Sequence, residues 1–152
     1  MNQAGPAPLD AHLGYWLRLV SNAVSHGFRR KVEATGVTVA EWVILRALFD
    51  ADAQPPSALA DHLGLTRGAI SRLADRLEAK SLIHRHADQT DRRSHVLGLT
   101  RAGRALVPKL AALADANETE FFGALTREER KALDAMLRQL AARHDFKRSP
   151  ID

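Results

Sequence analysis

The stretch from Ser57 to Thr100 limits the fold of this chain more than any other part of it. A short apolar pattern in this stretch ends at Gly64, and a second pattern begins after Thr66. A threonine hydroxyl can accept hydrogen bonds from the free backbone N–H groups of a first helical turn, so Thr66 is a suitable N-cap. In the second pattern apolar residues recur at helical spacing, which predicts one buried face: Ile70, Leu73, Ala74 and Leu77. Two helices joined by a turn that contains glycine predict a helix-turn-helix.

The opposite face of the second helix begins with small residues and continues with arginines. At about 100° per residue, this face contains Gly68, Arg72, Asp75 and Ala79, with Ser71 and Arg76 on its flanks. An arginine fork can bind two acceptors on a guanine edge, and the N–H groups of a helix start can bind a phosphate. The alternative is that these arginines are only solvated. We expect DNA contacts from Ser57, Thr66, Arg67, Gly68, Ala69, Ser71, Arg72 and Arg76.

Two short strand candidates, Leu82–His86 and His95–Leu99, follow the second helix. They enclose a polar loop, residues 87–94. Two strands around a basic loop directly after such a helix are typical of a wing, so we predict a mainly α-helical winged helix-turn-helix. Arginine at a loop tip suits the negative potential of a narrow minor groove. We therefore add three wing residues to the expected DNA contacts: Asp91, Arg92 and Arg93.

The positive charge of the chain is concentrated in the same stretch. The net charge is +4, and residues 57–104 contain nine Lys or Arg against five Asp or Glu, so the rest of the chain balances at zero. A charge excess confined to one segment is expected for a protein that binds a polyanion. A solvated charged face is the alternative, but the excess coincides with the predicted helix and wing.

Long apolar helices are expected on both sides of this stretch. Residues 9–34 carry a helical stripe: Leu13, Trp16, Leu17, Val20, Val24 and Phe28. A capping box at 38–41 begins a second helix, and residues 50–56, with two prolines, form the clearest linker. Near the C-terminus, Thr100 is expected to cap a helix over 101–122, in which Pro108 predicts a kink or a break. A second capping box, at 126–129, begins a last helix whose inward residues are expected to be Leu133, Met136, Leu137 and Leu140.

These terminal stripes exceed what one winged module can cover. We expect a single domain over 1–152, in which 38–100 form the DNA-binding part and 9–36 and 101–146 form the dimerisation helices of a homodimer. Such a dimer would read an inverted repeat in double-stranded DNA.

Over about residues 9–144, the chain resembles the MarR family of bacterial transcription regulators. The most specific match is residues 91–103, DRRSHVLGLTRAG, which fit the wing signature of the family. Residues 59–64 and 70–78 fit its helix-turn-helix. The resemblance implies that the terminal helices form the dimer interface, that Arg93 enters the minor groove, and that Asp91 braces an arginine at the wing. It also implies a repressor that releases DNA on binding a small aromatic or anionic effector.

Three sets of residues have competing interpretations. Asp91 is either an arginine brace or a turn residue. The histidine cluster His84, His86 and His95 is better explained as surface residues near DNA than as a metal site, because no further ligand has supporting spacing. Trp16 and Trp42 either pack in the core or line an effector pocket.

Several classes of function find no support in the sequence. The absence of cysteine excludes disulfides and thiol-based peroxide sensing. We expect no cofactor, no metal and no enzyme activity, because no catalytic motif is present. No long apolar run or signal peptide occurs, so we expect a cytoplasmic protein without a membrane partner. The leading interpretation is a sequence-specific, ligand-responsive regulator, and the alternative is a non-specific architectural DNA-binding protein.

Overall fold

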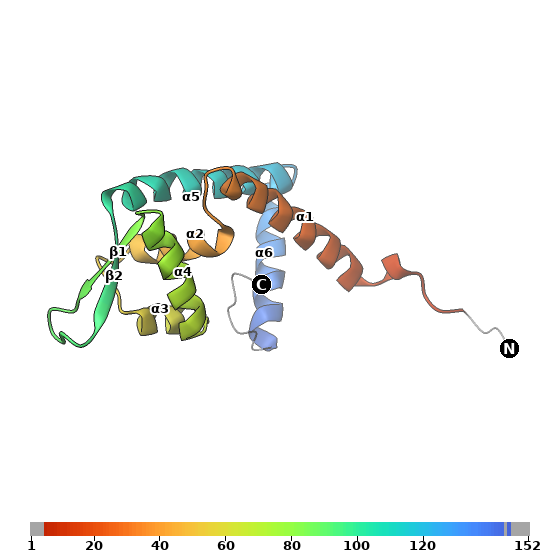
Figure 1. Cartoon of the computed structure of the whole chain (residues 1–152). Helices are drawn as coiled ribbons and strands as arrows, with labels where there is room; N and C mark the ends of the chain where they lie inside the picture. Colours follow the sequence, from red (N-terminus) through yellow and green to blue (C-terminus); the bar gives the residue numbers. More distant parts are fainter. Residues whose placement is uncertain (1–4, 145, 147–152) are drawn as a thin grey trace.

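The computed structural model describes residues 5–144 and 146, and it is mainly helical (Figure 1). The elements are a 3-10 turn η1 (Leu9–Ala11), α1 (Leu13–Glu33), α2 (Val39–Phe49), α3 (Pro56–Leu63), α4 (Arg67–Ala79), β1 (Ile83–Ala87), β2 (His95–Leu99), α5 (Arg101–Phe122) and α6 (Arg127–Arg143). In this part of the chain, no helix is both long enough and apolar enough to span a bilayer. The predicted winged helix-turn-helix is confirmed.

The winged part, α2 to β2, follows the local signals of the sequence. Pro56 occupies the first turn of α3, and Gly64 ends that helix in the left-handed conformation with a φ of 68°. Thr66 caps α4, since its hydroxyl accepts the Ala69 N–H at 3.1 Å. The strands pair antiparallel, with Ile83 opposite Leu99. The expected linker also joins this hairpin, because Gln54 exchanges two backbone hydrogen bonds with Leu97, at 2.8 and 2.9 Å.

The core lies between α2, α4, the hairpin and the first half of α5. Its fully buried side chains come from each of these elements and from α3, and they include Ile44, Leu45, Leu48, Leu59, Ile70, Leu77, Ile83, Leu97, Val107 and Leu110. One charged side chain is also buried there. Glu41, only 1% exposed, completes the capping box of α2 and accepts a hydrogen bond from Lys80 Nζ at 2.7 Å. This ion pair links the start of α2 to the end of α4.

Helices α1 and α5 cross at a close approach. Gly27 on α1 is buried, and a Cβ atom there would lie only 2.6 Å from the ring of Phe121 on α5. Beside it, Asn117 donates from Nδ2 to the Val24 carbonyl at 3.2 Å and accepts from Lys31 Nζ at 3.0 Å. The buried amide is therefore satisfied on both sides. This crossing fixes the second half of α1 against α5.

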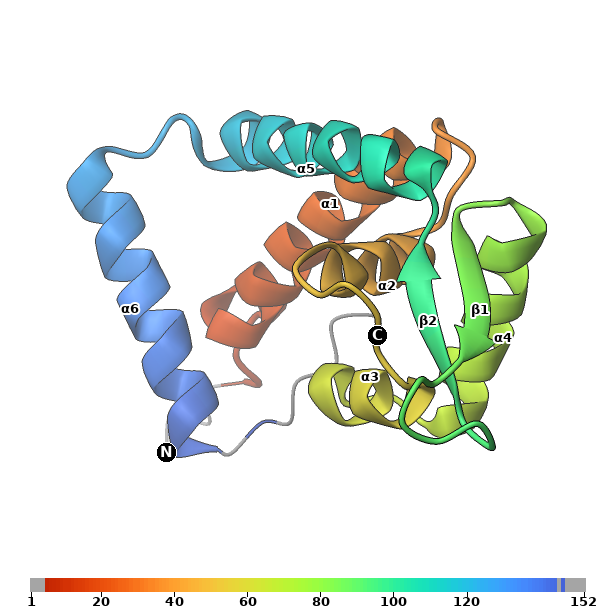
Figure 2. The same ribbon diagram turned by 90° about the vertical axis from the view of Figure 1, so that its left-hand side faces the viewer.

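The first half of α1 and all of α6 stand apart from this core. Figure 1 shows α1 running away from the winged part, and Figure 2 shows α6 at the opposite end of α5 from it. The expected inward position of the α6 stripe is wrong for a single chain: Met136, Leu137 and Leu140 are 42–55% exposed. On α1, Leu13 is 88% exposed and Trp16 and Leu17 are about half exposed. Neither stripe finds a cover within one described chain.

A few boundaries differ from those expected. The break considered at Pro108 does not occur, since α5 continues from Arg101 to Phe122. Proline lacks one N–H donor, but Pro108 is exposed and its neighbours Val107 and Leu110 are buried, so core packing holds the helix on that side. Strand β1 is shifted by one residue towards the C-terminus. Residues 1–4, 145 and 147–152 lie outside the described residues.

Gly103→Ala is expected to destabilise the fold by about 2–3 kcal/mol, because added atoms in a packed site force the backbone apart. A Cβ atom at Gly103 would lie 2.0 Å from the Leu82 carbonyl oxygen, which accepts the Thr100 N–H. Urea unfolding followed by circular dichroism measures this change. Gly14→Ala is the control, since a Cβ there meets nothing within 4 Å. Equal unfolding free energies for the two variants would contradict the expectation.

Candidate DNA interface

Helix α4 presents the face that its sequence predicts. The four apolar residues of its stripe are buried, and Arg67, Gly68, Ser71, Arg72 and Arg76 are exposed. Ala69 is half-buried, and Ser57 is half-buried at the start of α3. The face begins with small side chains, so the backbone N–H groups of the first turn can be approached closely. The exposed arginines follow over the next turns.

The wing loop is held in shape by two aspartates. Asp91 accepts the Arg93 N–H at 3.0 Å and the Ser94 hydroxyl at 3.2 Å. Asp88 accepts both the N–H and the hydroxyl of Thr90, at 2.9 Å each, and these bonds hold the pKa of the Asp88 carboxyl below its usual value. The first of these bonds, from the Thr90 N–H, has the largest effect on this pKa. The loop is therefore ordered by its own side chains.

This structure shows Asp91 as a turn residue. Among the described residues it has no ion pair with an arginine side chain, so the arginine brace stays a prediction for the DNA complex. Arg92 and Arg93 are exposed at the loop. They border an open hollow of about 390 Å³ on the wing, which is lined by Arg85, His86, Ala87, Arg92, Arg93, Ser94 and His95. The hollow is basic, as expected for a surface that meets a phosphate backbone.

The histidines lie on the solvent side of the hairpin. His84 and His86 share one face of β1, and their Nδ1 atoms are 2.9 Å apart. Gly98 lies opposite His84, where a Cβ atom would come within 2.7 Å of the imidazole ring, so the ring rests directly on β2. Within residues 5–144 and 146, no group of three or more His, Asp or Glu side chains comes close enough to hold a metal ion.

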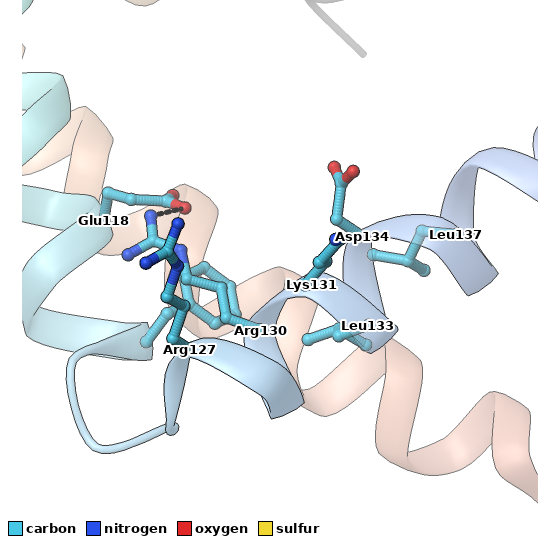
Figure 3. A pocket seen from close by; sticks show the side chains of 8 residues that line it. Glu118, Arg127, Arg130, Lys131, Leu133, Asp134 and Leu137 are labelled. Carbon is cyan, nitrogen blue, oxygen red and sulfur yellow. Dashed lines mark hydrogen bonds and ion pairs between the residues drawn. The ribbon is translucent and has the colours of Figure 1, made fainter.

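The two tryptophans lie in different environments. Trp16 is half exposed, donates from Nε1 to the Asp10 carbonyl at 2.8 Å, and packs edge-on against Tyr15. Trp42 is half-buried against the core. Neither lines the open cavity of about 590 Å³ between α5 and α6, where Arg130 pairs with Glu118 at 2.6 Å beside Leu133 and Leu137 (Figure 3). A shared tryptophan pocket stays a prediction.

The comparisons with known proteins agree with this geometry. A family model described as the MarR family matches residues 37–95. A putative transcriptional regulatory protein for the hcr operon of Thauera aromatica is 30% identical over 133 residues, which cover 87% of this chain and 80% of the relative. The chain belongs to the MarR family. It is therefore a DNA-binding transcription regulator.

Two further proteins are similar to this MarR-family chain over most of its length. An HTH-type transcriptional repressor of Mycobacterium tuberculosis is 29% identical over 133 residues, 88% of this chain and 96% of that one. The structure of BpsR from Bordetella bronchiseptica, solved to explain how 6-hydroxynicotinic acid regulates its DNA binding, matches with a TM-score of 0.76. BpsR is 28% identical, and the match covers 90% of this chain and 98% of BpsR.

The structure also brings together residues that sequence reasoning missed in this MarR-family wing. Arg85 on β1 reaches Asp75 and Glu78 on α4. One signal was available: alternation puts Arg85 on the face of β1 opposite His84 and His86. A cation on the covered face of a strand needs a partner, and α4 lies directly before it in sequence. The burial of Glu41 had no such signal, because a capping box is also common on exposed helices.

Proposed function

We propose that this chain is a repressor that binds an inverted-repeat operator as a homodimer and is released by a small effector. The DNA-binding part of this proposal is supported by one observation: the winged part has two basic surfaces, one on α4 and one on the wing loop. The exposed arginines of α4 suit the major groove, and the wing arginines Arg92 and Arg93 suit the adjacent minor groove or its phosphates. The proposed contacts are those expected from the sequence, residues 57, 66–69, 71, 72, 76 and 91–93.

The proposal of a homodimer rests on the uncovered apolar stripes of α1 and α6. Exposed apolar patches of this extent are uncommon on monomers and mark interfaces. Both stripes come from the parts assigned to dimerisation, 9–36 and 101–146, and the cavity between α5 and α6 opens beside Leu133 and Leu137. Two copies joined through their terminal helices would present two α4 helices to one duplex, about 34–36 Å apart.

Selection of bound duplexes from a random pool, followed by a screen for compounds that release the protein, tests this function. Enrichment of one inverted repeat is expected. Equal binding of all duplexes, with affinity set only by salt, would instead favour a non-specific architectural DNA-binding protein, since such binding is nearly all counterion release. Lack of affinity for any duplex would refute both.

We propose an aromatic or anionic effector that is sensed close to the tryptophans. Support comes from the relative BpsR, whose DNA binding is regulated by 6-hydroxynicotinic acid. To turn a 1:99 population of the released form into 99:1, an effector has to favour that form by about 5.5 kcal/mol. The chain is further proposed to act in the cytoplasm and to have no enzyme activity, since the relatives described above are transcription regulators.

A double Trp16→Phe, Trp42→Phe variant is expected to lose ligand-driven release while retaining operator binding. Phenylalanine keeps an apolar ring but removes the indole N–H, which Trp16 uses to bond Asp10. The effect is measured by fluorescence anisotropy of a labelled operator bound to the protein, titrated with a compound from the screen that releases the natural protein from DNA. If ligand-driven release is unchanged, the two tryptophans are packing residues and do not line an effector pocket.

A further inference from the structure

Arg85 joins the wing to the recognition helix. It lies at the middle of β1, opposite Leu97, and its side chain turns back to α4. Arg85 Nη2 donates to Asp75 Oδ1 at 2.5 Å, and Arg85 Nε lies 3.2 Å from Glu78 Oε2 without hydrogen-bond geometry. The arginine side chain is 29% exposed. Its link to α4 is therefore one charge-assisted hydrogen bond and one Coulombic contact, to carboxylates that are 64% and 47% exposed.

The wing has other attachments besides Arg85. On the β2 side, Gln54 of the linker exchanges two backbone hydrogen bonds with Leu97, which lies opposite Arg85. On the β1 side, the other attachments lie nearer the base. The chain leaves α4 through Ser81, which has a φ of 58°, and the Leu82 N–H returns to the Leu77 carbonyl at 3.0 Å. Ile83 is buried at the first position of β1. These contacts hold β2 to the linker and the base of β1 to the end of α4. Arg85 lies further towards the loop than the other β1 attachments, and its side chain joins the middle of β1 to Asp75 and Glu78 on α4.

The same contact changes the charge of the DNA-reading face. Asp75 shares the exposed face of α4 with Arg72, where a free carboxylate would repel phosphates. Arg85 draws this carboxylate towards the wing and offsets its charge. The side chain of Arg85 can therefore affect DNA binding in two ways, through geometry and through charge, and the two make different predictions.

We propose that Arg85 is a positioning residue that fixes the angle between the wing and α4, so that Arg72 and Arg93 reach neighbouring grooves together. This inference rests on the proposed function. The wing can contribute fully to binding only while Arg85 holds Asp75 and Glu78. Arg85 acts through these residues and needs no contact with DNA.

A double-mutant cycle on the full chain tests this coupling. Arg85→Met keeps the length and apolar stem of the side chain but removes its fork and charge. On an operator with A·T-rich flanks, Arg93→Ala is expected to weaken binding about tenfold in the natural background and less than about twofold beside Arg85→Met. Arg46→Met is the matched control, since it removes an arginine paired with Asp50 at the end of α2. It should leave the Arg93→Ala loss unchanged.

The Asp75→Asn variant distinguishes an effect on the angle of the wing from an effect on the charge of the α4 face. It also keeps the proposal testable if Arg85→Met fails to fold. Charge alone predicts that Asp75→Asn tightens binding equally on every duplex. Loss of the Arg85 contact predicts that the preference for A·T-rich over G·C-rich flanks falls, although a negative charge has been removed. Affinities on both flanks at fixed salt decide between the two.

Two results would overturn the inference. One is an equal Arg93→Ala loss with and without Arg85, and the other is an Asp75→Asn variant that keeps its full flank preference. A natural chain that shows no sequence preference at all would instead refute the proposed function, and this outcome is visible before any variant is measured.

Discussion

Leu140→Glu on α6 and Leu17→Glu on α1 are each expected to turn the dimer into a monomer and to weaken operator binding about a hundredfold or more, since linked sites gain about 10²–10⁴ in avidity. Both leucines are about half exposed in the single chain, and the proposed dimer covers them. A carboxylate buried there without a partner opposes association. Light scattering at micromolar concentration and anisotropy on full operators and half-sites measure the two effects.

Ala135→Glu is the matched control for α6. It introduces the same charge on the opposite side of the helix from Leu140, and Ala135 is already exposed. The control should remain dimeric and bind the operator normally. A natural chain that scatters as a stable monomer would contradict the dimer directly. A selected site without dyad symmetry would contradict it independently.

Arg72→Ala and Arg93→Ala are expected to lose DNA affinity in different ways. Arg72 lies on the exposed face of α4, so its loss should cost about 1–3 kcal/mol on the operator and relax the preference at one base pair in each half-site. Arg93 lies on the wing loop, so its loss should matter most where the flanks are A·T-rich and narrow. Each arginine that also neutralises a phosphate should reduce the log–log salt slope by about 0.9.

Titration of both variants on operators with exchanged half-site bases and exchanged flanks, at fixed salt, separates these roles. If Arg93→Ala loses the same free energy on every flank, the wing only clamps phosphates, and the minor-groove assignment is wrong. If Arg72→Ala keeps the full base preference, Arg72 contacts phosphate or solvent.

Local signals were enough to predict the winged part. The caps at Thr38, Thr66 and Thr100, the helix end at Gly64 and the period of the α4 stripe each act within one or two turns, and all five are confirmed. The exposed face of α4 followed from these, because a helix with one fixed buried stripe has only one opposite face.

Contacts between elements could not be predicted in the same way. Periodicity showed that Asp75 is exposed, but it did not show that β1 passes close enough for Arg85 to reach it. The apolar stripe of α6 was recognised, yet periodicity could not show that this stripe stays exposed in the single chain. At Pro108 a local rule predicted a kink or a break, and the break does not occur because buried neighbours hold the helix.

The unbroken α5 is a rigid connection between the wing and the α1–α6 end of the molecule. This helix begins only two residues after β2 ends at Leu99, and its 22 residues span about 33 Å to the crossing with α1 and the turn into α6. A rod of this length that tilts by about 5° about one end moves its other end by about 3 Å. A small rotation between two subunits at the far end would thus be amplified into a displacement of the wing comparable to the length of a hydrogen bond.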